Sequence, residues 1–219
     1  MAEQQHVSTT RAAYDTVAES YADIVRDELD GRHLEHGLLA TFAARVTSGQ
    51  VLEVGCGSGR ITEQLYRLGL DVAGMDLSPN MIEVARREHP HLRFGVGSME
   101  ALDAGDSSVA GIVAWYSIIH TPPTQLPAVF AELHRVLTPN GPLLLAFQSG
   151  NERVRLESVY GHSVSYDAYR LDPDAVAGML VEADFEVDVR VHRAPMGYES
   201  TSQAFLIARK RNTVGPDDR

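Results

Sequence analysis

The chain has 219 residues and a formal net charge of −11, and 44% of its residues are hydrophobic. This length predicts one α/β domain with a sizeable core rather than two domains. The negative charge argues against a protein that grips nucleic-acid backbones, because such proteins need a basic face. No stretch approaches the roughly 18 consecutive apolar residues of a membrane span. We therefore expect neither a nucleic-acid partner nor a membrane span.

The N-terminus and the cysteine content bear on the cellular compartment. Met1 to His6 lack the basic and apolar regions of a signal peptide. Cys56 is the single cysteine, so an intrachain disulfide is excluded and a reducing compartment fits. We expect a cytoplasmic protein that is a monomer or a homodimer.

Helical and extended patterns alternate along the chain. Helices are predicted over 8–27 and 33–46, ahead of strands at 50–54, 71–75, 92–96, 109–114, 142–147, 185–193 and 201–209. Further helices are expected after most of these strands, with N-caps at Ser78 and Thr124 and a start at Asp172-Pro173. This alternation predicts a parallel sheet covered on both faces. Residues 212–219 are expected to form a loose tail.

Residues 148–170 interrupt this alternation. The segment is polar, rich in aromatic residues and without a clear period, and it is long for a plain connection in a compact domain. Such a loop is typical of a lid or a binding element, so we expect it to cover a substrate.

The stretch from Val51 to Gly59 reads as a buried strand that runs into a glycine loop. Its glycines follow G-x-G-x-G, whereas a dinucleotide fingerprint needs G-x-G-x-x-G, and Arg60 occupies the position of that last glycine. Glu53 adds negative charge just before the loop, which disfavours a bound pyrophosphate. The pattern therefore favours a nucleoside ligand with a cationic centre and no phosphate.

These residues resemble motif I of the Rossmann-like, class I S-adenosylmethionine-dependent methyltransferases. The resemblance extends in the right order to the segments 14–21, 72–81, 97–102, 109–120 and 135–141. The chain is similar above all to small-molecule methyltransferases of the ubiquinone/menaquinone-biosynthesis type. The resemblance implies a three-layer α/β/α sandwich around a mostly parallel seven-stranded sheet whose last strand is antiparallel. It also implies a single methyltransferase domain over 1–211, in which helices within 1–48 close the cofactor site.

The resemblance also implies the residues that bind S-adenosylmethionine and its product S-adenosylhomocysteine. Asp76 would accept both ribose hydroxyls, and Glu53 would order the glycine loop. Leu77 and Met81 would pack against the adenine, although packing in the core explains them almost as well. The full set of expected cofactor residues is Tyr14, Tyr21, Glu53, Gly55, Cys56, Gly57, Gly59, Asp76, Leu77, Met81, Ser98, Met99, Glu100 and Trp115.

Ser98 departs from the family pattern, which often has an aspartate there to accept the adenine amino group. A serine hydroxyl can accept a hydrogen bond but carries no charge. Tyr14 and Tyr21 lie seven residues apart on one helix face, and packing alone explains them as well as a cofactor contact does. Glu100 is equally consistent with a solvated loop acid.

The methyl acceptor is expected beyond the strand 109–114, at the carboxyl edge of the sheet. His120 is a candidate general base, because its unperturbed pKa lies near 6.5, and a structural histidine is the alternative. The expected substrate residues are Tyr116, His120, Tyr160, His162, Tyr166 and Tyr169. No metal site is expected, because His33 and His36 lack an evident third ligand.

The sequence therefore predicts an enzyme that transfers a methyl group to O, N or C of a small molecule by in-line displacement. One alternative is an NAD-type oxidoreductase, which Arg60 disfavours. The others are a non-catalytic S-adenosylmethionine-binding module and a methyltransferase that acts on a macromolecule. An Asn/Asp-Pro-Pro-Tyr/Phe motif after the fourth strand would indicate methylation of a planar base nitrogen, and this chain has Ala114 to Ser117 there.

Overall fold

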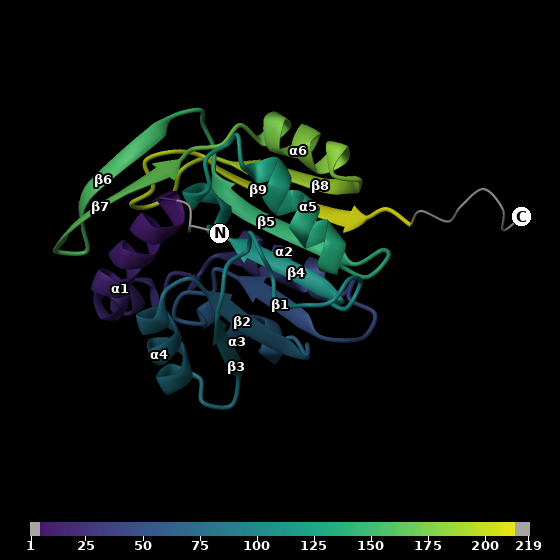
Figure 1. Ribbon diagram of the computed structural model, residues 1–219, viewed down its shortest axis with the longest axis horizontal. Coiled ribbons are helices and arrows are strands. Elements are labelled where there is room, and N and C mark those ends of the chain that lie inside the picture. The colour runs from purple at the N-terminus through teal and green to yellow at the C-terminus, as the bar shows by residue number, and fades with distance from the viewer. Residues whose placement is uncertain (1–4, 213–219) are drawn as a thin grey trace, which may run out of the picture.

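The computed structural model describes residues 5–212. A central sheet forms from seven strands, which are covered by helices on both faces, and a separate two-stranded sheet stands beside it (Figure 1). The helices are α1 (Gln5–Val25), α2 (His33–Ala43), α3 (Arg60–Arg67), α4 (Pro79–Glu88), the 3-10 helix η1 (Ile118–His120), α5 (Leu126–Val136) and α6 (Pro173–Glu182). The strands are β1 (Val51–Val54), β2 (Val72–Asp76), β3 (Arg93–Val96), β4 (Gly111–Trp115), β5 (Pro142–Gln148), β6 (Arg153–Val159), β7 (His162–Tyr169), β8 (Phe185–Arg193) and β9 (Gln203–Lys210).

The strand order of the large sheet is β3-β2-β1-β4-β5-β9-β8. Strands β1 to β5 pair in parallel, and β9 pairs antiparallel with both β5 and β8. This arrangement confirms the predicted mostly parallel sheet with an antiparallel last strand. The chain turns in opposite directions from β1 and β4, which are neighbours, so a crevice opens at their carboxyl ends.

Alternating side chains along the strands build two core layers. On β5, Leu143, Leu145 and Phe147 pack with the buried faces of α5 and α6. Leu144 and Ala146 point to the other face and pack with α2 and α3. Because both faces are covered, β5 reads as a continuous apolar run, as expected of a central strand.

The segment expected as an aperiodic loop is instead a β-hairpin, so that prediction was wrong. Strands β6 and β7 pair antiparallel up to Val159 and His162, which leaves a two-residue turn of Tyr160 and Gly161. Both turn residues have positive φ, 51° and 81°, as a type I′ hairpin turn requires. Figure 1 shows the hairpin against helix α1 at one end of the molecule.

The starts of α4 and α5 differ in how they are capped. Ser78 caps α4 as predicted, because its Oγ accepts the Met81 N–H at 3.1 Å. Thr124 does not cap α5: the helix starts at Leu126, after Gln125, and has no side-chain cap. Pro127 lies in the first turn, where its missing N–H costs nothing. Except for Asn212, the expected tail lies outside the described residues.

Candidate functional site

A pocket of about 730 Å³, counting space open to solvent, lies at the carboxyl ends of β1, β2 and β4. Helix α1 forms one wall. The lining residues are His6, Val7, Thr10, Tyr14, Tyr21, Gly55, Gly57, Met75, Asp76, Leu77, Gly97, Ser98, Met99, Glu100, Trp115, Tyr116, Ser117, His120 and Thr121.

The glycine loop after β1 forms the floor of the pocket. The backbone N–H groups of Gly55 and Cys56 both donate to the Met75 carbonyl, at 2.7 and 2.9 Å, so the loop is tied to the end of β2. Gly57 has a φ of 52°, and a side chain at this position would meet the ring of Tyr21 at 3.2 Å. Glycine therefore allows the loop to approach helix α1 closely at this position.

Asp76 is held by two backbone donors. The N–H of Gly57 donates to Oδ2 and the N–H of Ser78 donates to Oδ1, each at 2.9 Å. Burial raises the pKa of this carboxyl, and the two N–H groups oppose that shift. A carboxylate offers about four lone-pair positions, so two remain for the hydroxyl groups of a ligand.

The opposite wall is the loop after β3. The Ser98 hydroxyl accepts the N–H of Glu100 at 3.2 Å, and it keeps its proton available for a ligand. Glu100 Oε1 also lies 2.8 Å from His6 Nε2. This contact joins the start of α1 to the loop and closes one side of the pocket.

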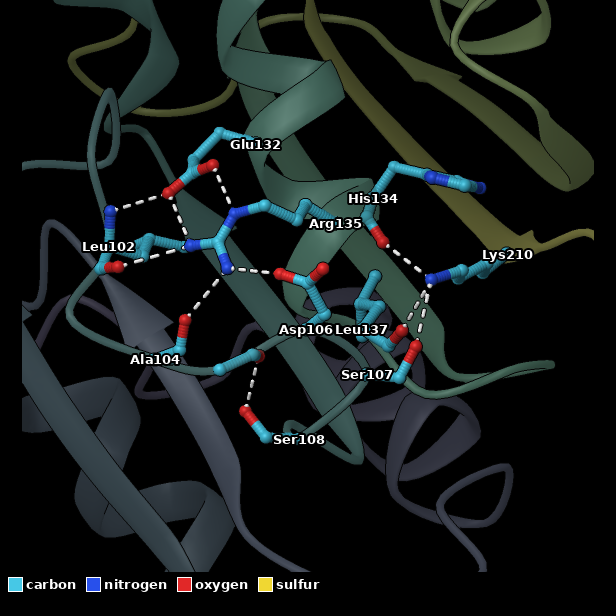
Figure 2. A network of polar contacts seen from close by, with 11 residues as sticks. Leu102, Ala104, Asp106, Ser107, Ser108, Glu132, His134, Arg135, Leu137 and Lys210 are labelled. Carbon is cyan, nitrogen blue, oxygen red and sulfur yellow. Dashed lines mark hydrogen bonds and ion pairs between the residues drawn. The ribbon is translucent and has the colours of Figure 1, made fainter.

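Arg135 holds this loop in place without contacting the pocket. Its guanidinium donates to the carbonyls of Leu102 and Ala104 at 3.2 and 2.9 Å and to Asp106 at 2.7 Å. It also forms a two-point pair with Glu132, which in turn accepts the Leu102 N–H at 2.7 Å. Figure 2 shows how these contacts fasten the loop to helix α5. Arg135, the first residue of the 135–141 motif, therefore has a structural role: it fixes the loop after β3.

Four expected cofactor residues do not line the pocket. Glu53 is 1% exposed and accepts a hydrogen bond from the Thr62 hydroxyl, and burial raises the pKa of Glu53 to about 8. The Cys56 side chain packs with Phe94 in a core cluster. Gly59 is the N-cap of α3. Met81 is fully buried among side chains of α1 and α4, which favours the alternative that it packs in the core.

The other end of the pocket is aromatic and uncharged. The hydroxyl of Tyr14 lies 2.9 Å from His120 Nε2, and burial lowers the pKa of His120 to about 4. The ring is therefore neutral at pH 7 and a weak base. These contacts favour a structural role for His120 over the role of general base. Its side chain joins η1 to helix α1.

The hairpin residues that were expected to face the substrate lie outside the pocket. Tyr166 and Tyr160 pack against Tyr14 and Tyr21 of α1, with ring centroids 5.7 and 5.5 Å apart. His162 Nε2 lies 2.9 Å from the hydroxyl of Ser20, and Tyr169 packs against the large core cluster. The hairpin thus supports helix α1 from behind.

Sequence reasoning missed seven lining residues: His6, Val7, Thr10, Met75, Gly97, Ser117 and Thr121. The first three belong to an early turn of α1, which begins at Gln5 and not at residue 8. Met75, Gly97 and Ser117 directly neighbour predicted residues at the ends of strands. Position at a strand end was the signal that could have found them.

Within residues 5–212, no cluster of three or more metal-ligating side chains occurs. In the same part of the chain, no helix is long and apolar enough to cross a membrane.

Comparison with known proteins gives a consistent result. Residues 51–141 match the family model described as "Methyltransferase domain". A demethylmenaquinone methyltransferase from Renibacterium salmoninarum is 32% identical over 137 residues, which cover 62% of this chain and 56% of that protein. The chain spans about half the length of the curated relatives it matches.

Two solved structures share the fold. Magnesium protoporphyrin IX methyltransferase from Synechocystis, solved with bound S-adenosylmethionine, superposes with a TM-score of 0.72 at 15% identity and covers 96% of this chain and 99% of that chain. A (4+2)-cyclase superposes with a TM-score of 0.70 at 18% identity, over 94% and 97%. At such identities the likeness shows the fold, and the activity has to be argued from the site.

Proposed function

The chain belongs to the Rossmann-like, class I S-adenosylmethionine-dependent methyltransferases, and we propose that it transfers a methyl group from S-adenosylmethionine to a small-molecule acceptor. One observation carries the proposal. Among the described residues that line the pocket there is no lysine or arginine, whereas Asp76 and Glu100 are acidic and four side chains are aromatic. Such a lining suits a cationic sulfonium and leaves a pyrophosphate without a cationic partner, which disfavours a dinucleotide.

The residues present fit this cofactor. The two uncommitted positions on the Asp76 carboxylate suit the ribose hydroxyls. Leu77, Ser98 and Met99 offer apolar contacts and one hydroxyl for the adenine. The methionine part is proposed to lie along the part of the pocket that Gly55, Gly57 and Tyr21 line.

The bound cofactor supplies an electrophilic methyl group: the acceptor lone pair forms the new bond to carbon, and the old bonding pair stays on sulfur. The protein's contribution is alignment and exclusion of water. Helix α1 supplies both, because it covers the pocket and is anchored by Tyr14 to His120 and by Asp15 to Ser78, whose hydroxyl donates at 2.5 Å. With a pKa of about 4, His120 holds Tyr14 in position and does not take the acceptor's proton.

The acceptor is proposed to be a small molecule. In support, a curated relative is named for demethylmenaquinone, which is a small molecule. Helix α1 covers part of the pocket, which favours a small acceptor over a folded macromolecule. The hairpin of β6 and β7 packs against helix α1. We propose that it affects acceptor binding indirectly, because it holds α1 in position over the pocket.

The test incubates the full chain with S-adenosylmethionine that carries a labelled methyl group, together with a panel of small carboxylates, phenols, amines and quinols. We expect label to move to at least one class, with one S-adenosylhomocysteine formed per methyl transferred. A chain that binds the cofactor but transfers label to no class contradicts methyl transfer and favours a non-catalytic or cyclising role.

A further inference from the structure

Arg60 is the first residue of α3 and directly follows Gly59, the last glycine of the loop after β1. The loop is closely packed here, because a Cβ at Gly59 would lie 2.7 Å from the ring of Phe94. The Arg60 side chain is 15% exposed and pairs with Glu28, in the turn after α1. Arg60 itself does not line the cofactor pocket. This pair therefore ties the glycine loop to the end of helix α1 from outside the pocket.

The same guanidinium contacts Tyr21, which belongs to α1 and lines the pocket. Burial raises the pKa of the Tyr21 hydroxyl, and the positive charge of Arg60 and the hydrogen bond that it donates to this hydroxyl oppose the shift. The Tyr21 ring lies close to the glycine loop, since a Cβ at Gly57 would be 3.2 Å from it. Tyr21 is thus held at its hydroxyl by Arg60 while its ring covers Gly57.

Glu28 gives Arg60 a second point of attachment. Its Oε2 pairs with Arg60, and its Oε1 accepts the hydroxyl of Tyr198 at 2.5 Å, from the loop between β8 and β9. Arg60 therefore holds helix α1 at Tyr21 and the turn after the helix at Glu28. Two such points fix both the distance and the rotation of this end of α1 relative to the glycine loop, whereas one point would leave the rotation free.

The contacts along α1 differ in burial. The contacts of Tyr14 and Asp15 described above hold the first half of the helix. In the second half, Glu19 pairs with Arg87, but their side chains are 69% and 56% exposed, and exposed pairs of this kind contribute little to stability. Arg60 is therefore a buried polar anchor for the second half of α1, the half that carries Tyr21.

We propose that Arg60 is a positioning residue for the cofactor: it sets how closely Tyr21 covers the glycine loop, and it thereby controls the affinity for the methionine part of S-adenosylmethionine without changing the affinity for the nucleoside part. This inference rests on the methyl transfer proposed above, in which the methionine part lies along the pocket wall that includes Tyr21. The residues proposed to hold the nucleoside, Asp76 and Ser98, are fixed by backbone N–H groups instead.

The test compares two ligands of the full chain by calorimetry. S-adenosylhomocysteine has the whole product structure, whereas 5′-methylthioadenosine keeps the nucleoside and the sulfur and lacks the amino acid part. In Arg60→Met, we expect the affinity for S-adenosylhomocysteine to fall at least about tenfold, because a buried charge-assisted contact is lost. The affinity for 5′-methylthioadenosine should stay at the parental value. Arg60→Lys keeps a cation and should retain part of the affinity for S-adenosylhomocysteine.

Glu28→Gln provides a second variant should Arg60→Met fail to fold, because it weakens the hold on Arg60 and keeps the shape of the side chain. It should lower the affinity for S-adenosylhomocysteine selectively, as Arg60→Lys does. In a Tyr21→Phe background, Arg60→Lys should cost less affinity than in the parent, since both changes act on one contact. The matched control is Arg67→Met, on the same helix, which removes a pair with Glu63 and should leave both affinities unchanged.

Equal losses for the two ligands would make Arg60 a general support of the fold and would overturn the proposal. Parental affinity for S-adenosylhomocysteine in folded Arg60→Met or Glu28→Gln variants would overturn it as well. An unaltered chain that does not bind S-adenosylhomocysteine would instead overturn the proposed function.

Discussion

The hydroxyl of Tyr14 lies 2.9 Å from Nε2 of His120, so helix α1 is joined across the pocket to the 3-10 helix η1, which follows β4. Both side chains line that pocket. This buried contact therefore links the helix that covers the site to the segment that follows β4.

Tyr14→Phe removes this contact and leaves a buried ring nitrogen of His120 without a partner. We expect the free energy of unfolding to fall by about 1–3 kcal/mol and the affinity for S-adenosylhomocysteine to fall as well, because α1 loosens. Urea unfolding and calorimetry measure the two effects. Tyr66→Phe is the control, since Tyr66 is 48% exposed and lies away from the pocket. Equal stability of Tyr14→Phe and the parent would show that the contact does not hold the helix.

The pH dependence of stability reports on His120. Burial lowers its pKa from 6.5 to about 4, so below pH 6.5 the unfolded state binds a proton that the folded state does not. The stability contributed by the neutral ring is complete above pH 6.5 and falls as the pH drops toward 4, by about 1.4 kcal/mol per pH unit. Measured against His120→Gln in urea, the parent should lose stability faster between pH 6.5 and 5. Parallel curves for the two proteins would mean that the ring titrates normally.

Asp76 should carry a large share of the nucleoside affinity. Asp76→Ala removes an acceptor that two backbone N–H groups hold in place, and we expect binding of S-adenosylhomocysteine to weaken by about 1–3 kcal/mol. Asp71→Ala is the matched control, because that carboxylate pairs with Arg93 at the surface. An unchanged affinity in Asp76→Ala would place the ribose elsewhere.

Arg135 offers a test of positioning at a distance. Arg135→Met removes the contacts to Leu102, Ala104 and Asp106, so the loop after β3 should exchange its amide hydrogens faster and the cofactor should bind more weakly. Hydrogen exchange and calorimetry measure both changes. Arg153→Met, which breaks a pair with Asp167 on the hairpin, should leave the loop unaffected. A loop with parental exchange rates in Arg135→Met would refute this role.

Much of the fold could be predicted from the sequence because local chemistry and pattern agree. Ser78 and Pro79 mark the start of α4, and the apolar run at 142–147 marks a strand buried on both faces. Gly55, Gly57 and Asp76 lie in the pocket because strand ends converge at one edge of a parallel sheet.

The rest depends on tertiary packing. The hairpin carries a period-two pattern in Arg153–Val159 and a Tyr160-Gly161 turn, but polar residues on its outer face made the segment read as a loop. Met81 lies at the expected spacing and yet turns toward α1, because helical spacing does not say which neighbour a side chain meets. A small cavity behind Trp115 and Tyr116 is lined by residues of the segment 28–35 and by Glu199 of the loop between β8 and β9, and no sequence pattern brings these residues together.

Calorimetric titration of the full chain with S-adenosylhomocysteine and, separately, with NAD tests the central claim most directly. We predict one saturable site per chain for S-adenosylhomocysteine, weakened by Asp76→Ala, and no binding of NAD. Binding of NAD without binding of S-adenosylhomocysteine or S-adenosylmethionine would contradict the account.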